Sequence, residues 1–175
     1  MKWIGSFAMA AFLVGSCCFG QMPPSRVTKA STVVDSGYSI TVAPPAGPIR
    51  LGSPINVTVT VTNAGGKEIL WRSEFSDTAY QAFRFQLAQN GQEAEKTPFH
   101  RKVRGEQRPG DPPEVEHGSS ITSSLAAGKS FTFTIDLKRL YHITEPGLYT
   151  LDVSRVEDDN VTIVRAQTLT LKVAR

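Results

Sequence analysis

One stretch of the chain gathers side chains suited to binding a negatively charged partner. Residues 96–119 show neither the two-residue alternation of a strand nor the period of a helix. The first half, residues 96–108, holds five basic residues and one acidic residue, and the second half holds three acidic residues. Long loops on rigid scaffolds are common recognition sites. The candidate binding residues are Lys96, Phe99, His100, Arg101, Lys102, Arg104 and Arg108.

Two interpretations of this loop stay open. In the first, it contacts an acidic protein, a glycan or a lipid surface, and Phe99, which has no strand neighbours, is an exposed aromatic. In the second, it is a solvated crossover whose basic and acidic halves neutralise each other.

No motif for catalysis or cofactor binding is complete. Gly128-Lys129-Ser130 resembles the end of a phosphate-binding loop, but Ser123 stands where that motif needs its first glycine. A strand pattern follows it, where the motif needs a helix. The sequence also lacks a Gly-x-Ser-x-Gly nucleophile elbow. We therefore predict a protein that is not an enzyme and binds no cofactor.

Metal binding is not favoured either. The three histidines form no His-Glu-x-x-His pair and no two lie at helical ligand spacing. His117 has two acidic neighbours, but a solvated loop histidine explains it better. Glu157-Asp158-Asp159-Asn160 lacks the ligand spacing of a calcium loop, so a hairpin turn is the better interpretation.

The N-terminus has the parts of a secretory signal peptide over residues 1–20. A lysine precedes an uncharged apolar run, which ends in small residues. Cleavage after Gly20 would release a secreted or periplasmic protein. Alternatively, Val14-Gly15-Ser16-Cys17 resembles a lipobox, and Cys17 would anchor an envelope lipoprotein. An uncleaved membrane anchor is a third interpretation, because Trp3 to Gly20 is borderline in length for a membrane span.

Cleavage would also remove both cysteines, which lie in this leader. A mature chain released at Gln21 would then have no disulfide and no membrane span. Residues 21–36 are rich in Pro, Ser and Thr and are interpreted as a flexible tether. Because the protein is expected to be exported and its basic run is short, we expect no nucleic-acid partner.

From residue 37 onward the pattern is typical of an all-β domain. The chain has 175 residues, 40% of them hydrophobic and 20% charged, with a formal net charge of +3, which suits one globular domain. Apolar residues alternate with polar ones in 55–61, 83–87, 131–137 and 149–153. Asn63-Ala64-Gly65-Gly66 and Asn90-Gly91 are expected to be hairpin loops. Val161 to Val173 changes parity midway, which predicts a bulge or a change of partner.

One segment resembles the immunoglobulin fold. Leu137, Leu140 and Tyr141 have the spacing of one helical turn, and Glu145-Pro146-Gly147-Leu148-Tyr149 resembles a tyrosine corner. The resemblance implies a Greek-key β-sandwich of about seven to nine strands over residues 37–175. It also implies that the Tyr149 hydroxyl bonds to upstream backbone. Leu151 and Val59 would replace the two cysteines, and Trp71 would be the core tryptophan.

We further expect Phe133 and Ile135 to belong to the core. The chain is similar to bacterial exported sandwich proteins of no settled role, and more distantly to the intracellular proteinase inhibitor family, whose members lack a leader.

The function predicted from these observations is contact rather than catalysis. Our first hypothesis is an exported interaction module that binds an unidentified protein or envelope surface through residues 96–119. The alternatives are a protease inhibitor that presents a loop to a protease, and, less favoured, a glycan-binding sandwich.

Overall fold

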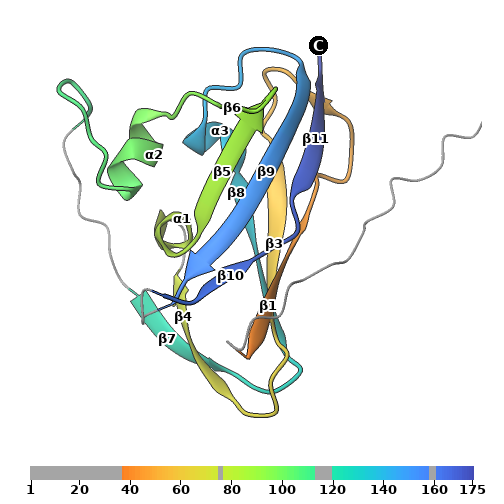
Figure 1. Cartoon of the computed structure of the whole chain (residues 1–175), viewed down its shortest axis with the longest axis vertical. Helices are drawn as coiled ribbons and strands as arrows, with labels where there is room; N and C mark the ends of the chain where they lie inside the picture. The colour runs from red at the N-terminus through yellow and green to blue at the C-terminus, as the bar shows by residue number, and fades with distance from the viewer. Residues whose placement is uncertain (1–36, 75–76, 113–119, 158–160) are drawn as a thin grey trace, which may run out of the picture.

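The structure is a computed structural model that describes residues 37–74, 77–112, 120–157 and 161–175 (Figure 1). The predicted signal peptide and tether, with Cys17, lie outside these residues. No helix in the described ranges is long and apolar enough to cross a membrane.

Strands dominate these ranges, which confirms the all-β class. Eleven strands and three short helices follow one another in the described residues. In chain order they are β1 (Tyr38–Ala43), β2 (Ile49–Arg50), β3 (Asn56–Asn63), β4 (Ile69–Glu74), α1 (Asp77–Ala82), β5 (Arg84–Gln89), β6 (Gln92–Glu93), α2 (Pro98–Val103), β7 (Ser120–Leu125), β8 (Ser130–Asp136), α3 (Leu137–Leu140), β9 (Gly147–Val156), β10 (Ile163–Arg165) and β11 (Leu169–Ala174).

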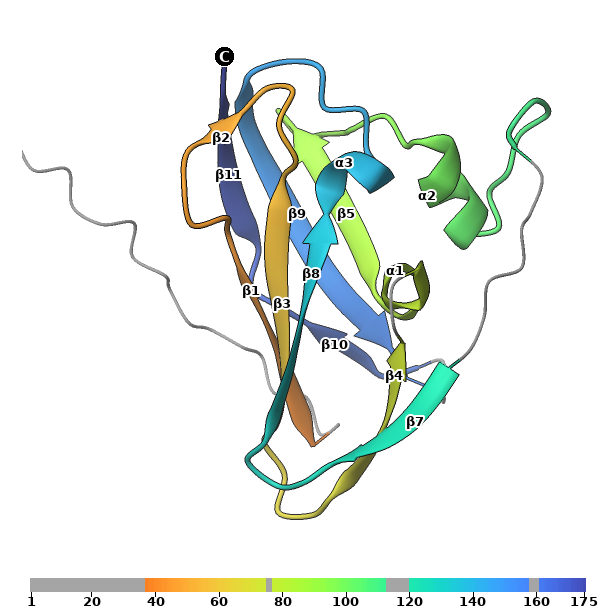
Figure 2. The same cartoon turned by 180° about the vertical axis from the view of Figure 1, so that it is seen from behind.

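The strands form two main sheets and a small ribbon (Figures 1 and 2). One sheet has the order β1-β3-β8. The second has the order β2-β11-β9-β5-β6, and β10 also pairs with β9. β4 and β7 form a separate two-stranded sheet.

The alternating residues of the two main sheets fill the core between them. Val57, Val59 and Val61 of β3 are fully buried, as are Ile135 of β8 and Leu151 of β9. Val59 and Leu151 therefore have the core positions that the resemblance gave them. Phe133 is half-buried and packs on Phe83, with ring centroids 5.1 Å apart.

Several local predictions are confirmed. Asn90 and Gly91 have φ of 52° and 78°, and they join the antiparallel strands β5 and β6. The parity change falls between β10 and β11, which both pair with β9, so the predicted change of partner does not occur. The two registers differ by one residue, as the alternative of a bulge predicts. The helical turn is α3, and the Tyr149 hydroxyl donates to the Glu145 carbonyl at 2.7 Å.

The predicted hairpin at residues 63–66 is wrong. β3 does not pair with β4; it pairs with β1 and β8, while β4 pairs with β7. The β3–β8 and β4–β7 pairs follow one another along the same two chain segments, so together they make a bent two-stranded ribbon (Figure 2). Asn63 lies at the bend, fully buried, and its side-chain nitrogen donates to the carbonyls of Lys67 and Leu125.

The resemblance made Trp71 the core tryptophan, and this stays a prediction. The strand beside β9 is β5, and its buried aromatic residue is Phe85. Trp71 belongs to β4, and its side chain lies outside the described part of the structure.

Candidate functional site: an arm packed against the sandwich

The predicted loop contains a helix, so the expectation of a segment without helical structure is wrong. α2 begins at Pro98, and Thr97 caps it by accepting a hydrogen bond from the His100 amide at 3.1 Å. Proline at the first helical position is also typical of helix starts. Because α2 has only six residues, it shows no repeated apolar period. We call residues 93–111 the arm, and residues 105–110 its tip.

Backbone bonds fix the base of the arm to the segment around α3. The Thr97 amide donates to the Leu140 carbonyl at 2.9 Å, and the His142 amide donates to the Glu95 carbonyl at 2.8 Å. Lys96 and Tyr141 form an antiparallel bridge between these bonds. The arm is therefore anchored to α3 before α2 begins.

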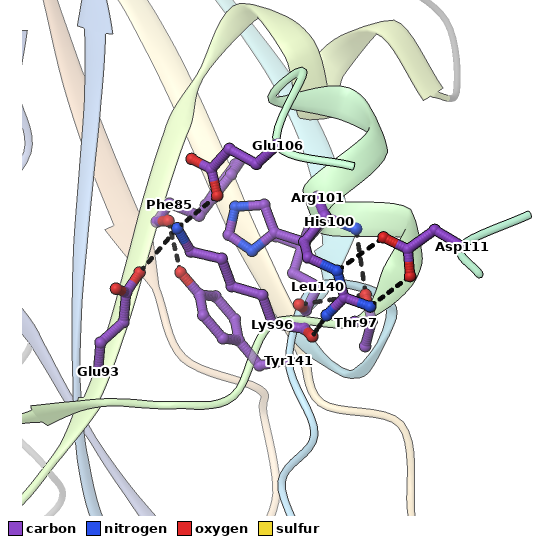
Figure 3. Close-up of polar contacts among 10 residues, drawn as sticks. All are labelled: Phe85, Glu93, Lys96, Thr97, His100, Arg101, Glu106, Asp111, Leu140 and Tyr141. Carbon is purple, nitrogen blue, oxygen red and sulfur yellow. Dashed lines mark hydrogen bonds and ion pairs between the residues drawn. The ribbon is translucent and has the colours of Figure 1, made fainter. Parts of the chain in front are cut away.

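Arg101 turns inward and pairs with Asp111 (Figure 3). Its Nε donates to Asp111 Oδ2 at 2.8 Å and its Nη2 donates to Oδ1 at 2.6 Å, a bidentate pair. A third nitrogen, Nη1, donates to the Lys96 carbonyl at 2.5 Å. The bond from Arg101, helped by the Arg108 amide, holds the pKa of Asp111 well below its usual range. This pair ties the two ends of the tip together.

Arg104 binds the end of α1. Its guanidinium donates to the carbonyls of Gln81 at 3.3 Å and Tyr80 at 3.1 Å, and also to that of Phe83. These carbonyls lie at the C-terminal end of α1, where helical carbonyls lack helical partners. Burial lowers the pKa of Arg104, and the nearby positive charge of Arg84 adds to this effect. Arg104 thus joins the arm to the segment before β5.

His100 is packed into the protein and is only 2% exposed. Its ring meets the Tyr141 ring edge-on with centroids 4.8 Å apart, and the Tyr141 hydroxyl donates to the Phe85 carbonyl at 2.8 Å (Figure 3). The Nδ1 of His100 has no hydrogen-bond partner among the described residues. Burial, followed by the positive charges of Arg104 and Lys96, lowers the pKa of His100 to about 4. His100 is therefore neutral at neutral pH.

Phe99 was a candidate exposed aromatic, but it is half-buried. Its ring meets that of Tyr80 edge-on, with centroids 5.2 Å apart. The guanidinium carbon of Arg139 lies 4.4 Å from the Phe99 ring centroid and 5.0 Å from that of Tyr80. These are cation–π distances, so Arg139 covers the aromatic pair.

Lys96 lies between two carboxylates. Its ammonium nitrogen is 2.8 Å from Glu106 Oε2 and 3.4 Å from Glu93 Oε1 (Figure 3). The bond to Glu106 raises the pKa of Lys96 and lowers the pKa of the Glu106 carboxyl. Five of the seven candidate residues, namely Lys96, Phe99, His100, Arg101 and Arg104, thus have contacts that hold the arm in place. The second interpretation, in which the two halves neutralise each other, fits the Arg101–Asp111 pair; Lys96 is neutralised by Glu106 of its own half and by Glu93, which precedes the loop.

The tip is the outer end of the arm, and all of it faces solvent. All six residues from Gly105 to Gly110 are exposed, including Arg108, while Lys102 is half-buried on α2. The Glu106 amide donates to the Arg101 carbonyl at 2.7 Å, and the Asp111 amide donates to the Arg108 carbonyl at 3.0 Å. An exposed tip held at both ends suits recognition of another surface. The acidic second half of the predicted loop, beyond Pro112, lies outside the described residues.

Sequence reasoning missed Glu93 and Arg139 as members of this site. Glu93 pairs with Lys96 three residues further on, outside any helix, so no helical spacing pattern marked it. Arg139 acts through the aromatic faces of Tyr80 and Phe99, which are distant in sequence. The signal that was present is the Thr97-Pro98 pair, which is typical of a helix start. No group of three metal-ligating side chains occurs in the described part of the chain.

Comparisons with known proteins do not place the chain in a family. No protein-family model and no curated protein matches it. A similar solved structure is the β-glucosidase from Listeria innocua in complex with glucose, at 16% identity and a TM-score of 0.36. The match covers 79% of this chain but only 16% of the glucosidase chain.

Proposed function

We propose that the chain is an exported, non-enzymatic module with an immunoglobulin-like sandwich, and that it binds another protein through the tip of its arm. The signal-peptide pattern of residues 1–20 supports export. The main support for a binding role is the exposure of the tip. All six tip residues are exposed, while Arg101 before the tip and Asp111 after it are joined by a bidentate ion pair.

Strand order supports the immunoglobulin-like part of this proposal. The sheet β1-β3-β8 corresponds to one layer of such a sandwich, and β11-β9-β5 corresponds to the other. The Tyr149 hydroxyl bond to Glu145 has the geometry of a tyrosine corner at the start of the strand beside β5. In this alignment Phe85 takes the place of the core tryptophan.

The inward-facing arginines change the expected chemistry of contact. Arg101 and Arg104 are committed to Asp111 and to the end of α1, so they do not offer a basic surface. The tip instead offers one exposed basic side chain, Arg108, beside polar and turn-forming residues. Because the Arg101–Asp111 pair holds both ends of the tip before binding, we expect binding to cost little conformational entropy in the tip.

Charge reversal at the tip tests the proposal. Arg108→Glu alters an exposed side chain without removing the bonds of Arg101. Lys172→Glu is the matched control, since Lys172 is exposed on β11. We expect purified protein to capture a specific partner from envelope extract, Arg108→Glu to lose most of that capture, and Lys172→Glu to retain it. Equal capture by all three proteins would refute the role of the tip.

The same geometry favours a second candidate, protease inhibition. An exposed arginine in a loop held at both ends resembles a segment presented to a protease that prefers basic residues. Dose-dependent inhibition of such a protease, lost in Arg108→Ala, would support this candidate. Free cleavage of the tip by a broad protease panel, with no inhibition, would exclude it.

A further inference from the structure

The free edge of β8 is a second surface on which the chain can bind a partner strand. We propose that this edge pairs antiparallel with the β8 edge of a second copy of the chain, centred on Thr132, and so forms a symmetric dimer. The surface is separate from the arm, and the proposal does not depend on the role of the tip.

Hydrogen bonds at the two ends of β8 show which of its residues face outward. The Lys129 carbonyl accepts from Asn63 and the Leu137 amide donates to Ile55, so odd-numbered residues bond toward β3. The Asp136 amide instead donates to the Tyr80 hydroxyl on the opposite side. Because bonding direction alternates along a strand, the backbone groups of Ser130, Thr132 and Thr134 point away from β3.

Within the described residues, no strand covers this edge. β8 pairs with β3 alone, and β7, the strand that precedes it, pairs with β4. Ser130, Thr132 and Thr134 are all exposed. Their outward amides and carbonyls are therefore available to a further strand.

The β8 edge also lacks the features that normally prevent strand pairing. Natural edge strands are protected by charges, prolines, bulges or short length. Residues 130–135 read Ser-Phe-Thr-Phe-Thr-Ile, with no charge and no proline. By contrast, the edge strands β2 and β6 have two residues each, and Pro44-Pro45 follows β1. β8 is thus a long edge strand without these protections; β1 and β7 are also uncharged edge strands of six residues, and β8 differs from them in its self-complementary sequence.

The sequence of β8 is complementary to itself, which favours a second copy over an unrelated strand. With Thr132 opposite Thr132 of the other copy, Ser130 faces Thr134 and Phe131 faces Phe133. Hydroxyl pairs of this kind already occur between β8 and β3, at 3.1 Å for Thr132 with Thr60 and 2.8 Å for Ser130 with Thr62. The half-buried rings of Phe131 and Phe133 would gain cover from each other.

Charges do not oppose this register. The nearest charged residues along the strand are Lys129 and Asp136. In the proposed pairing Lys129 faces Ile135, and Asp136 faces Gly128. No like charges therefore stand opposite each other across the strand pair.

Complementary charges at the centre of the pair provide the test. Thr132→Lys and Thr132→Glu each place like charges face to face in a dimer, whereas a mixture of the two variants places opposite charges face to face. We expect the unmodified protein to sediment as a dimer and each variant alone to dimerise at least about tenfold more weakly. We expect the mixture to recover a heterodimer, detected by native mass spectrometry.

Thr150→Lys is the matched control, because it adds the same charge to an exposed position on β9 and is expected to leave the dimer intact. Unchanged circular dichroism would show that the variants fold. A monomeric unmodified protein would overturn the proposal, as would dimers that survive in both variants or a mixture that stays monomeric. Purification of this protein with its β8 edge paired to a strand of a different protein would also overturn the proposal.

Discussion

At the scale of single residues, the basic side chains of the arm act as internal connections. Arg101, Arg104 and Lys96 each contact groups within the protein, and His100 sits among them as a neutral ring. Their types suggested attraction to an external acid, but their partners are the Asp111 carboxylate for Arg101, the end of α1 for Arg104, and the carboxylates of Glu106 and Glu93 for Lys96. The residue types therefore gave the charge of these side chains correctly, but the expectation that the side chains point towards an external partner was wrong.

His100 predicts how stability depends on pH. Its pKa is about 4 in the folded protein and 6.5 as the ordinary value, so the unfolded chain binds more protons between these limits. The free energy of unfolding should therefore fall as the pH falls from about 6.5 towards 4. Urea unfolding across this range measures the slope.

Substitution separates this effect from that of the carboxylates. Asp111 and Glu106 also have lowered pKa values, and their contribution is lost with acid below about pH 4.5. His100→Phe keeps a ring against Tyr141 and removes the titration, so the slope between about pH 6.5 and 4.5 should flatten. A slope unchanged in His100→Phe but flattened in the exposed control His142→Gln would contradict this assignment.

The Arg101–Asp111 pair predicts the order of the tip. Asp111→Asn removes the charge and weakens the bidentate pair, while leaving the side chain almost the same size. Amide hydrogen exchange over residues 105–111 should then become faster, and exchange in β3 should not change. If the tip exchanges equally slowly in Asp111→Asn, the pair does not hold it.

At the scale of elements, the bent ribbon of β3–β4 and β7–β8 depends on one buried amide. Asn63 supplies two donors to carbonyls at the bend and accepts from the Gly65 amide at 3.0 Å. These bonds satisfy backbone groups that would otherwise be buried without partners. Asn63 thus allows the paired strands to change direction without leaving the carbonyls of Lys67 and Leu125 unbonded.

We expect Asn63→Ala to lower the free energy of unfolding by about 1–3 kcal/mol, because it leaves those carbonyls unpaired. Asn56→Ala, at an exposed position of the same strand, is the control and should change it little. Denaturant unfolding of both variants makes the comparison. Equal losses would mean that the bend does not rely on Asn63.

Local patterns and distant pairings differ in how well the sequence predicts them. Alternation located β3, β5, β8 and β9, because a strand with one buried face repeats every two residues. Asn90-Gly91 located its turn through the positive φ that both residues tolerate. The pairing of β4 with β7 was missed, since about fifty residues separate these strands and alternation does not name a partner.

The sequence drew attention to this segment but did not predict how its side chains are arranged. The length and charge of residues 96–119 predicted a contact site, and in the part that the structure describes Arg108 is exposed at the tip. The inward turns of Arg101 and Arg104 depend on Asp111 and the end of α1, which come together only in the folded chain. A rule that reads basic residues as surface residues fails wherever a buried partner is available.

At the scale of the whole molecule, β9 links the parts of the larger sheet. It pairs with β5, β10 and β11, carries the buried Leu151, and begins next to the Tyr149 hydroxyl bond. Leu151→Ala should lower the free energy of unfolding by about 2–5 kcal/mol through the cavity it leaves. Tyr149→Phe should lower it by about 0.5–1.5 kcal/mol through the lost hydrogen bond.

Both variants should unfold in one cooperative transition, because their side chains belong to the single core between the two sheets. Circular dichroism during urea unfolding measures both quantities. A Tyr149→Phe protein less stable than Leu151→Ala would show that the corner, rather than the core, dominates.

The most direct test of the proposed contact role is photo-crosslinking from the tip. A photoreactive residue at exposed Gln107 should join the chain to one partner protein in envelope extract, and the same residue at Lys172 on β11 should not. The product should disappear when unmodified protein is added as a competitor. No product from position 107, or identical products from both positions, would contradict the account.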